Sequence, residues 1–134
     1  MWLFPSDRIP DDMSLNRALR GIAVGRVASG VVGLAVPQLM ARWSRVPATP
    51  ELSYVTRVFG ARAIALGVGY LTCPESERPR WQRLALMVDT LDTTHGVAHV
   101  LRGDLPRPAA VFWATFTGSF MVLGASKLAR DLAS

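Results

Sequence analysis

The most restrictive feature of this sequence is the run PAAVFWATFTGSFMVLGAS at 108–126, which contains no charged residue. A helix that crosses the hydrocarbon core of a bilayer needs about 20 mainly apolar residues, and this run is close to that length. Three further apolar segments precede it, at 17–40, 53–73 and 81–102. With the last segment extended to 108–128, the sequence predicts four membrane-spanning helices.

The composition agrees with a membrane protein. Half of the 134 residues are hydrophobic and 19% are charged, which is apolar for a soluble domain of this size. The net charge is +5, and of the 15 Lys and Arg residues only Lys127 is a lysine. The arginines cluster between the apolar segments, as they do in membrane-protein loops. A nucleic-acid-binding protein would place them along one exposed face, so we expect no nucleic-acid partner.

The connections between the segments are short, charged and rich in proline, which predicts one domain at 17–130 with no long linker. Pro37 is expected to kink or end the first helix. Residues 1–16 lack a long apolar run and contain Pro5 and Pro10, so they do not resemble a signal peptide. The sequence instead predicts an N-terminal segment at the membrane interface. Cys73 is the only cysteine, which excludes redox enzymes that need a cysteine pair.

The distribution of positive charge predicts the orientation. With four spans in an up-down-up-down order, both termini and the 74–83 connection lie on one side. That side carries more Lys and Arg than the other, and positive loops favour the cytoplasm. We therefore expect a multi-pass protein of the bacterial cytoplasmic (inner) membrane with both termini cytoplasmic.

The segment at 81–102 carries a polar stripe on an otherwise apolar helix. At 100° per residue, Asp89, Asp92 and His99 fall within an arc of about 80°, and His95 lies at its border. Ionisable groups inside a membrane are costly and face partners within the bundle. The stripe is therefore expected to face the other helices.

Two arginines are candidate partners for the two aspartates. At 1.5 Å per residue, Arg26 and Asp89 lie roughly 13 and roughly 12 Å from the cytoplasmic side, and Arg62 and Asp92 roughly 18 and roughly 16 Å. The matching depths predict a buried ion-pair network that joins Arg26 to Asp89 and Arg62 to Asp92. A structural role competes with a role in proton or ion movement, since both place paired charges inside a bundle.

His95, His99 and Arg57 form a separate candidate site for a ligand or a proton, in the outer half of the predicted bundle. Two histidines four residues apart on a helix can bind one metal ion. The chain has no Glu-x-x-His motif and no histidine on a second helix, so we predict no metal site. No catalytic residue is predicted either.

Small residues recur every four positions in three of the segments, a spacing that lets helices approach closely in lipid. These helix-packing candidates are Gly21, Gly25, Ser29 and Gly33, then Ala61, Ala65 and Gly69, and finally Ala110, Ala114 and Gly118. Their number exceeds the needs of one bundle, so some are expected to contact partner helices. Trp43, Trp81 and Trp113 lie near predicted span ends and are expected to act as interfacial anchors.

The run RVFGARAIALGVGYL at 57–71, followed by an aspartate in the next helix, resembles a family of small actinobacterial membrane proteins of unknown function. These proteins are distantly similar to DoxX-like proteins. The pattern that carries the resemblance is Arg57, Gly60, Arg62 and Gly67. It covers about 53–126 and implies four spanning helices with no established activity.

Three functional hypotheses follow. The first is a non-catalytic accessory or scaffold subunit, or a homo-oligomer, whose partners are the bilayer and other membrane subunits or further copies of itself. The second is a redox or transport protein that handles protons, a quinone or a lipid through the Arg, Asp and His residues. The third is a soluble helical bundle with basic loops that bind an acidic partner. The first requires no cofactor, and an enzyme is the less favoured interpretation.

Overall fold

The computed structural model describes residues 9–133, and these residues are all-α, with no β-strand among them. The helices are α1 (Ile9–Ala35), α2 (Pro37–Trp43), α3 (Pro50–Thr72), α4 (Arg78–Arg102) and α5 (Arg107–Ala133), with a short 3-10 turn, η1 (Glu75–Glu77). Four of these helices, α1, α3, α4 and α5, cover the four apolar segments of the sequence. Helix α1 begins well before residue 17, so half of the segment expected to precede it is helical. The remainder of that segment lies outside the described residues.

The ends of the helices follow from local sequence. Pro37 cannot donate a backbone hydrogen bond, so α1 ends at Ala35 and a short separate helix, α2, begins at the proline. The hydroxyl of Thr49 accepts a hydrogen bond from the backbone N–H of Leu52 at 3.1 Å and caps the start of α3. At the other end of the chain, α4 stops at Gly103, whose φ of 67° is a backbone conformation that glycine adopts without strain.

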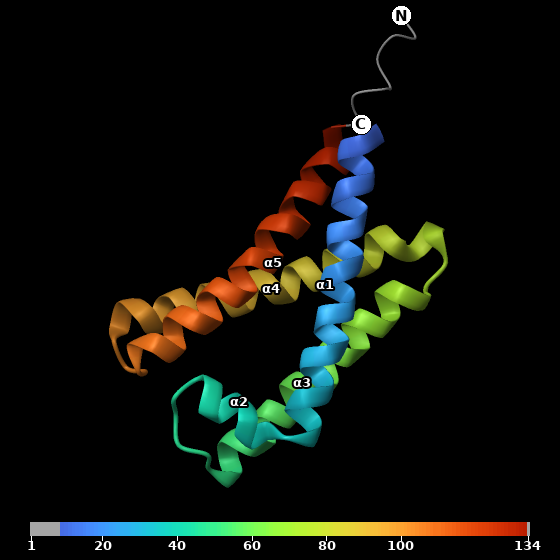
Figure 1. The fold of residues 1–134 in the computed structure, drawn as a ribbon. Coiled ribbons are helices and arrows are strands. Elements are labelled where there is room, and N and C mark those ends of the chain that lie inside the picture. The colour runs from blue at the N-terminus through green and yellow to red at the C-terminus, as the bar shows by residue number, and fades with distance from the viewer. Residues whose placement is uncertain (1–8, 134) are drawn as a thin grey trace, which may run out of the picture.

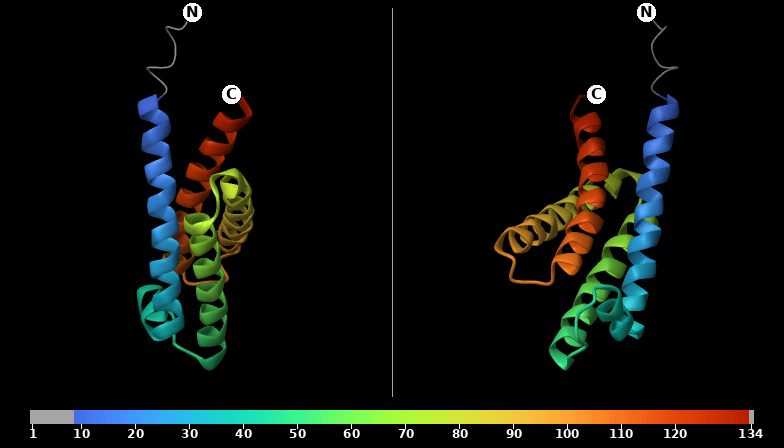
Figure 2. Two further views of the ribbon diagram at one scale, coloured as in Figure 1. Left: turned by 90° about the vertical axis from the view of Figure 1, so that its right-hand side faces the viewer. Right: turned by 60° about the vertical axis from the view of Figure 1, so that its left-hand side comes forward.

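The helices form two hairpins, one made by α1 and α3 and the other by α4 and α5 (Figure 1). Within each hairpin the two helices pack along much of their length, whereas the hairpins contact each other over a smaller region. The start of α1 and the end of α5 lie at the same end of the molecule, and α4 is steeply inclined to α1 (Figures 1 and 2). The hairpins therefore diverge from a common zone of contact.

Glycine brings α1 and α3 to backbone contact. A Cβ atom at Gly60 would lie 2.6 Å from the carbonyl oxygen of Gly30, and one at Gly67 would lie 2.6 Å from that of Ala23. Both distances are too short for any side chain. Gly33 also faces α3, with Thr56 O 3.3 Å from the place of its missing Cβ. These glycines fix how closely the first hairpin can pack.

Some of the small residues expected at helix contacts lie outside the contact between α1 and α3. Nothing lies within 4 Å of a Cβ built at Gly21 or Gly25, and Ala61 and Ala65 are exposed. A strict spacing of four residues drifts by about 40° per step around a helix, so such a stripe leaves the contact face within a few steps. The observed contact face instead alternates steps of three and four.

The second hairpin uses the residues expected of it. Ala110 is buried, and Ala114 packs against Gly96, with 3.2 Å from its Cβ to the place of the missing glycine Cβ. Gly118 faces Thr93, whose hydroxyl donates a hydrogen bond of 3.0 Å to Thr117 across α4 and α5. Gly69, at the end of α3, packs against the Trp81 ring of α4. Small residues thus allow close packing in the second hairpin and where the chain passes into it.

The distribution of polarity is the reverse of a soluble bundle. The buried apolar residues are mainly alanines, whereas many valines, leucines and aromatic residues of α1, α3, α4 and α5 are exposed. Two helices, Met13–Ala35 and Arg107–Ala133, are long and apolar enough to cross a membrane. Helices α3 and α4 do not meet that standard, because each carries charged residues along its length.

The glycine contacts give a testable prediction. Gly60→Ala is expected to lower the free energy of unfolding by about 1–3 kcal/mol, because the new methyl group meets the Gly30 carbonyl. Gly118→Ala is the matched control: it adds the same methyl group where the nearest atom, in the Thr93 side chain, lies at an ordinary contact distance of 3.6 Å. Thermal unfolding followed by tryptophan fluorescence measures both. Equal midpoints for the two variants would contradict the close packing of α1 and α3.

Candidate functional site

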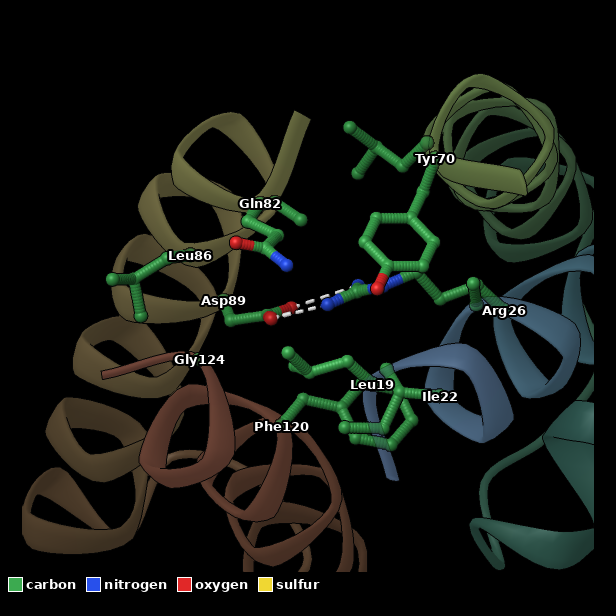
Figure 3. Close-up of a pocket in the computed structure, with 12 residues that line it drawn as sticks. Leu19, Ile22, Arg26, Tyr70, Gln82, Leu86, Asp89, Phe120 and Gly124 are labelled. Atoms are coloured by element: carbon green, nitrogen blue, oxygen red, sulfur yellow. Dashed lines mark hydrogen bonds and ion pairs between the residues drawn. The ribbon is translucent and has the colours of Figure 1, made fainter. Parts of the chain in front are cut away.

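The zone of contact between the hairpins centres on a buried ion pair. The Arg26 side chain of α1 donates two parallel hydrogen bonds to the carboxylate of Asp89 in α4 (Figure 3), and the Nη1–Oδ1 distance is 2.9 Å. Arg26 is 9% exposed and Asp89 3%. The Phe120 ring of α5 lies against the guanidinium, whose Cζ is 4.8 Å from the ring centroid. A fork-shaped guanidinium matches a carboxylate in this geometry, which fixes the relative orientation of the two helices.

A second ion pair lies beside the first. Arg62 Nη2 of α3 is 2.7 Å from Asp92 Oδ2 of α4, and their side chains are 42% and 27% exposed. The Arg62 guanidinium also lies 5.4 Å from the Phe59 ring centroid. The structure thus joins the same arginines and aspartates that the matching depths paired, with the second pair nearer the surface.

The four charged residues of this interface are divided between the two hairpins according to sign. Both arginines belong to the first hairpin and both aspartates to the second, so neither hairpin neutralises its own charges. Removing one member of a buried pair leaves an uncompensated charge, which is strongly unfavourable. The ion pairs therefore require the first hairpin to pack against the second in one register.

A hydrogen bond that the sequence did not predict forms a third link between the hairpins. Trp113 Nε1 of α5 donates to the hydroxyl of Ser44, just after α2, at 2.7 Å. Ser44 is buried, and the Phe59 ring meets the Trp113 ring edge to face with 5.9 Å between centroids. The sequence placed Trp113 at a membrane interface, and no local pattern pointed to its partner, which is 69 residues away.

Two small cavities flank the Arg26–Asp89 pair. One of about 30 Å³ is also lined by Tyr70 and Gln82, and Figure 3 shows both side chains near the ion pair. The other, of about 20 Å³, lies between the two ion pairs and is also lined by Thr117. Each is large enough for one or two water molecules and has polar groups that can bind water.

The histidines lie apart from the ion pairs. The exposed His95 has its Nδ1 2.7 Å from the carbonyl oxygen of Leu91 in its own helix, and His99 Nδ1 lies 2.7 Å from Asp104 Oδ1. This hydrogen bond lowers the pKa of the Asp104 carboxyl below its ordinary value. Arg57, the third member of the expected site, is exposed. The structure thus joins neither histidine to the network of Arg26, Arg62 and the two aspartates.

Residues 9–133 contain no cluster of three or more His, Cys, Asp or Glu side chains with the spacing of a metal site. Comparisons with protein families, with characterised proteins and with solved structures give no match to this chain. The resemblance to small actinobacterial membrane proteins therefore stays a prediction. What the site can do chemically is therefore inferred from the contacts described above.

The buried pair can be tested by neutralising one member. Asp89→Asn is expected to lower the free energy of unfolding by about 3–5 kcal/mol, because Arg26 stays buried without a counter-charge. Asp92→Asn is the matched control, and its loss is expected to be smaller because Arg62 is more exposed and can reorient. The measurement is the unfolding midpoint of the solubilised protein.

Replacing both members together separates charge from packing. The double variant Arg26→Leu with Asp89→Leu is expected to recover much of the loss of the single change, since no lone buried charge remains. A single Asp89→Asn variant that unfolds like the unmodified chain would show that the pair does not hold the hairpins together.

Proposed function

We propose that this chain is a small multi-pass protein of the bacterial cytoplasmic membrane that acts as a non-catalytic accessory or scaffold subunit, or as a homo-oligomer. In this proposal α1, α3, α4 and α5 all cross the bilayer as one four-helix bundle. Both termini lie in the cytoplasm. Length and composition alone support membrane crossing for α1 and α5. The proposal assigns membrane crossing to α3 and α4 as well.

The observation that carries the proposal is the inverted distribution of polarity. Arg26 and Asp89, in the middle of their helices, are buried against each other, whereas large apolar residues such as Val24, Val68 and Leu91 face outwards. In water this arrangement would expose much apolar surface and would offer little buried apolar surface in return. In a bilayer it is favourable, because the lipid covers the apolar residues and the charges meet partners inside the bundle.

A structural role for the charges is supported by how they are used. The two ion pairs are complete, and each joins one hairpin to the other. The open face of α1 at Gly21 and Gly25 supports contact with a further helix, from a second copy or another subunit, because small residues allow close approach in lipid.

The second candidate, proton movement through the bundle, is favoured by one observation. The water-sized cavities on either side of the Arg26–Asp89 pair connect polar groups in the centre of the bundle. Proton pathways in membrane proteins use such ionisable groups and water. Because His95 and His99 are not joined to the cavities, this path would run through the Arg and Asp residues alone.

Membrane placement and orientation can be tested together with single cysteines. In a Cys73→Ser background, Ser76→Cys lies in the η1 turn, which lines one cleft together with the start of α1 and the end of α5. Ala48→Cys lies in the connection between α2 and α3, at the opposite end of the molecule (Figure 1). In intact spheroplasts, a membrane-impermeant maleimide is expected to label Ala48→Cys directly. Ser76→Cys is expected to react only after permeabilisation.

The same preparation tests membrane residence. The protein is expected in the membrane pellet after a carbonate wash and in solution only with detergent. Recovery in the supernatant without detergent would overturn the proposal in favour of a soluble bundle. Labelling of both cysteines from outside would leave a membrane protein but contradict the four-span topology.

A further inference from the structure

A charged cleft of about 430 Å³ lies at the end of the molecule that holds both chain ends. The start of α1, the η1 turn, the start of α4 and the end of α5 contribute to its walls. Its charged lining consists of Glu75, Arg78, Arg83, Lys127 and Asp131. It is much larger than the cavities beside the ion pairs and is separate from them.

The cationic side chains of this cleft differ in how many contacts they make within the protein. Lys127 Nζ lies 2.6 Å from Asp131 Oδ1, so that pair is engaged. Arg78 makes a long contact of 3.4 Å with the exposed Glu75 carboxylate, and its guanidinium Cζ lies 5.7 Å from the Tyr70 ring centroid. Within residues 9–133, Arg83 is absent from the ion pairs. Arg78 and Arg83 therefore keep donors that an anion can use.

The cleft leads towards apolar surface. Gln82 and Arg83 line it and also line the closed seam between α4 and α5, whose other residues are Leu86, Gly124, Leu128 and Asp131. Leu86 and Gly124 in turn line the cavity beside Asp89, as Figure 3 shows. The cationic opening thus adjoins the outer surface of the seam between α4 and α5, where Leu86, Gly124 and Leu128 follow the polar residues, and this order of polarity matches that of a lipid molecule.

We propose that the cleft binds the phosphate of an anionic phospholipid headgroup through Arg78 and Arg83, with an acyl chain lying along Leu86, Gly124 and Leu128. Guanidinium groups bind phosphate oxygens through paired hydrogen bonds. Basic pockets between helices on the cytoplasmic side of a membrane are suited to such headgroups. Lys127 contributes positive charge although it is paired, and the three cations of the lining outnumber its two carboxylates, Glu75 and Asp131. This inference rests on the membrane placement proposed above.

The test uses the full chain in a mild non-ionic detergent. Short-chain phosphatidylglycerol is titrated against it, with phosphatidylcholine of the same chains as the zwitterionic comparison, and binding is followed by the rise in unfolding temperature and by native mass spectrometry. Phosphatidylglycerol is expected to bind more tightly. Arg83→Gln is expected to weaken its binding about fivefold, and Arg78→Gln with Arg83→Gln further.

Matched variants keep the test specific. Arg107→Gln removes an exposed arginine from the opposite end and is expected to leave binding unchanged, whereas Arg83→Lys is expected to retain most of it. Equal binding of both lipids, or equal losses for Arg83→Gln and Arg107→Gln, would overturn the inference.

Inorganic phosphate and glycerol 3-phosphate distinguish a lipid from a soluble source of the same group. Full competition by either at the lipid's own concentration would assign the cleft to a soluble phosphate and overturn the lipid inference. A protein that needs detergent but shows no lipid preference refutes this inference alone. A protein that stays dissolved without detergent refutes the membrane placement as well.

Discussion

The paired hydrogen bonds between Arg26 and Asp89 are the constraint on which the arrangement of this molecule depends. Two ionised groups are buried against each other, and each is tolerable only while the other is present. The pair requires α1 and α4, which belong to different hairpins, to keep one register. Arg62 with Asp92 and Trp113 with Ser44 then limit rotation about that point. Specificity between the hairpins comes from these polar contacts together with aromatic packing, in which the Phe59 ring meets Trp113 and the Trp81 ring covers Gly69.

Within the first hairpin the packing depends on glycine and not on paired charges. Gly30, Gly60 and Gly67 bring the α1 and α3 backbones so close that no side chain fits between them. Such contacts add van der Waals attraction over a long stretch and need no apolar core. This explains why the buried apolar residues are mostly alanines while larger ones face outwards. A chain of this size combines close backbone packing inside a hairpin with charge pairing between hairpins.

Much of this arrangement was accessible from the sequence, for identifiable reasons. The end of the first helix followed from Pro37, whereas the caps at Thr49 and Gly103 were not predicted although they also act through local backbone chemistry. The ion pairs followed from depth along helices of known rise, because the four charged groups had few other partners. The packing face of α1 did not follow, since many small residues compete for it and only a three-dimensional contact selects Gly30 over Gly25. The Trp113–Ser44 hydrogen bond did not follow from the sequence either, because both residues suit an exposed position.

The assignment of both arginines to the first hairpin has a consequence for synthesis in a membrane. The chain is made from its N-terminus, and Asp92 follows Arg62 by 30 residues while Asp89 follows Arg26 by 63. At ribosomal rates of about 5–20 residues per second, Arg26 waits roughly 3–13 s for its counter-charge. During that interval α1 and α3 carry unneutralised cations. Under the proposed membrane placement, full burial of the first hairpin in lipid therefore has to wait until α4 emerges.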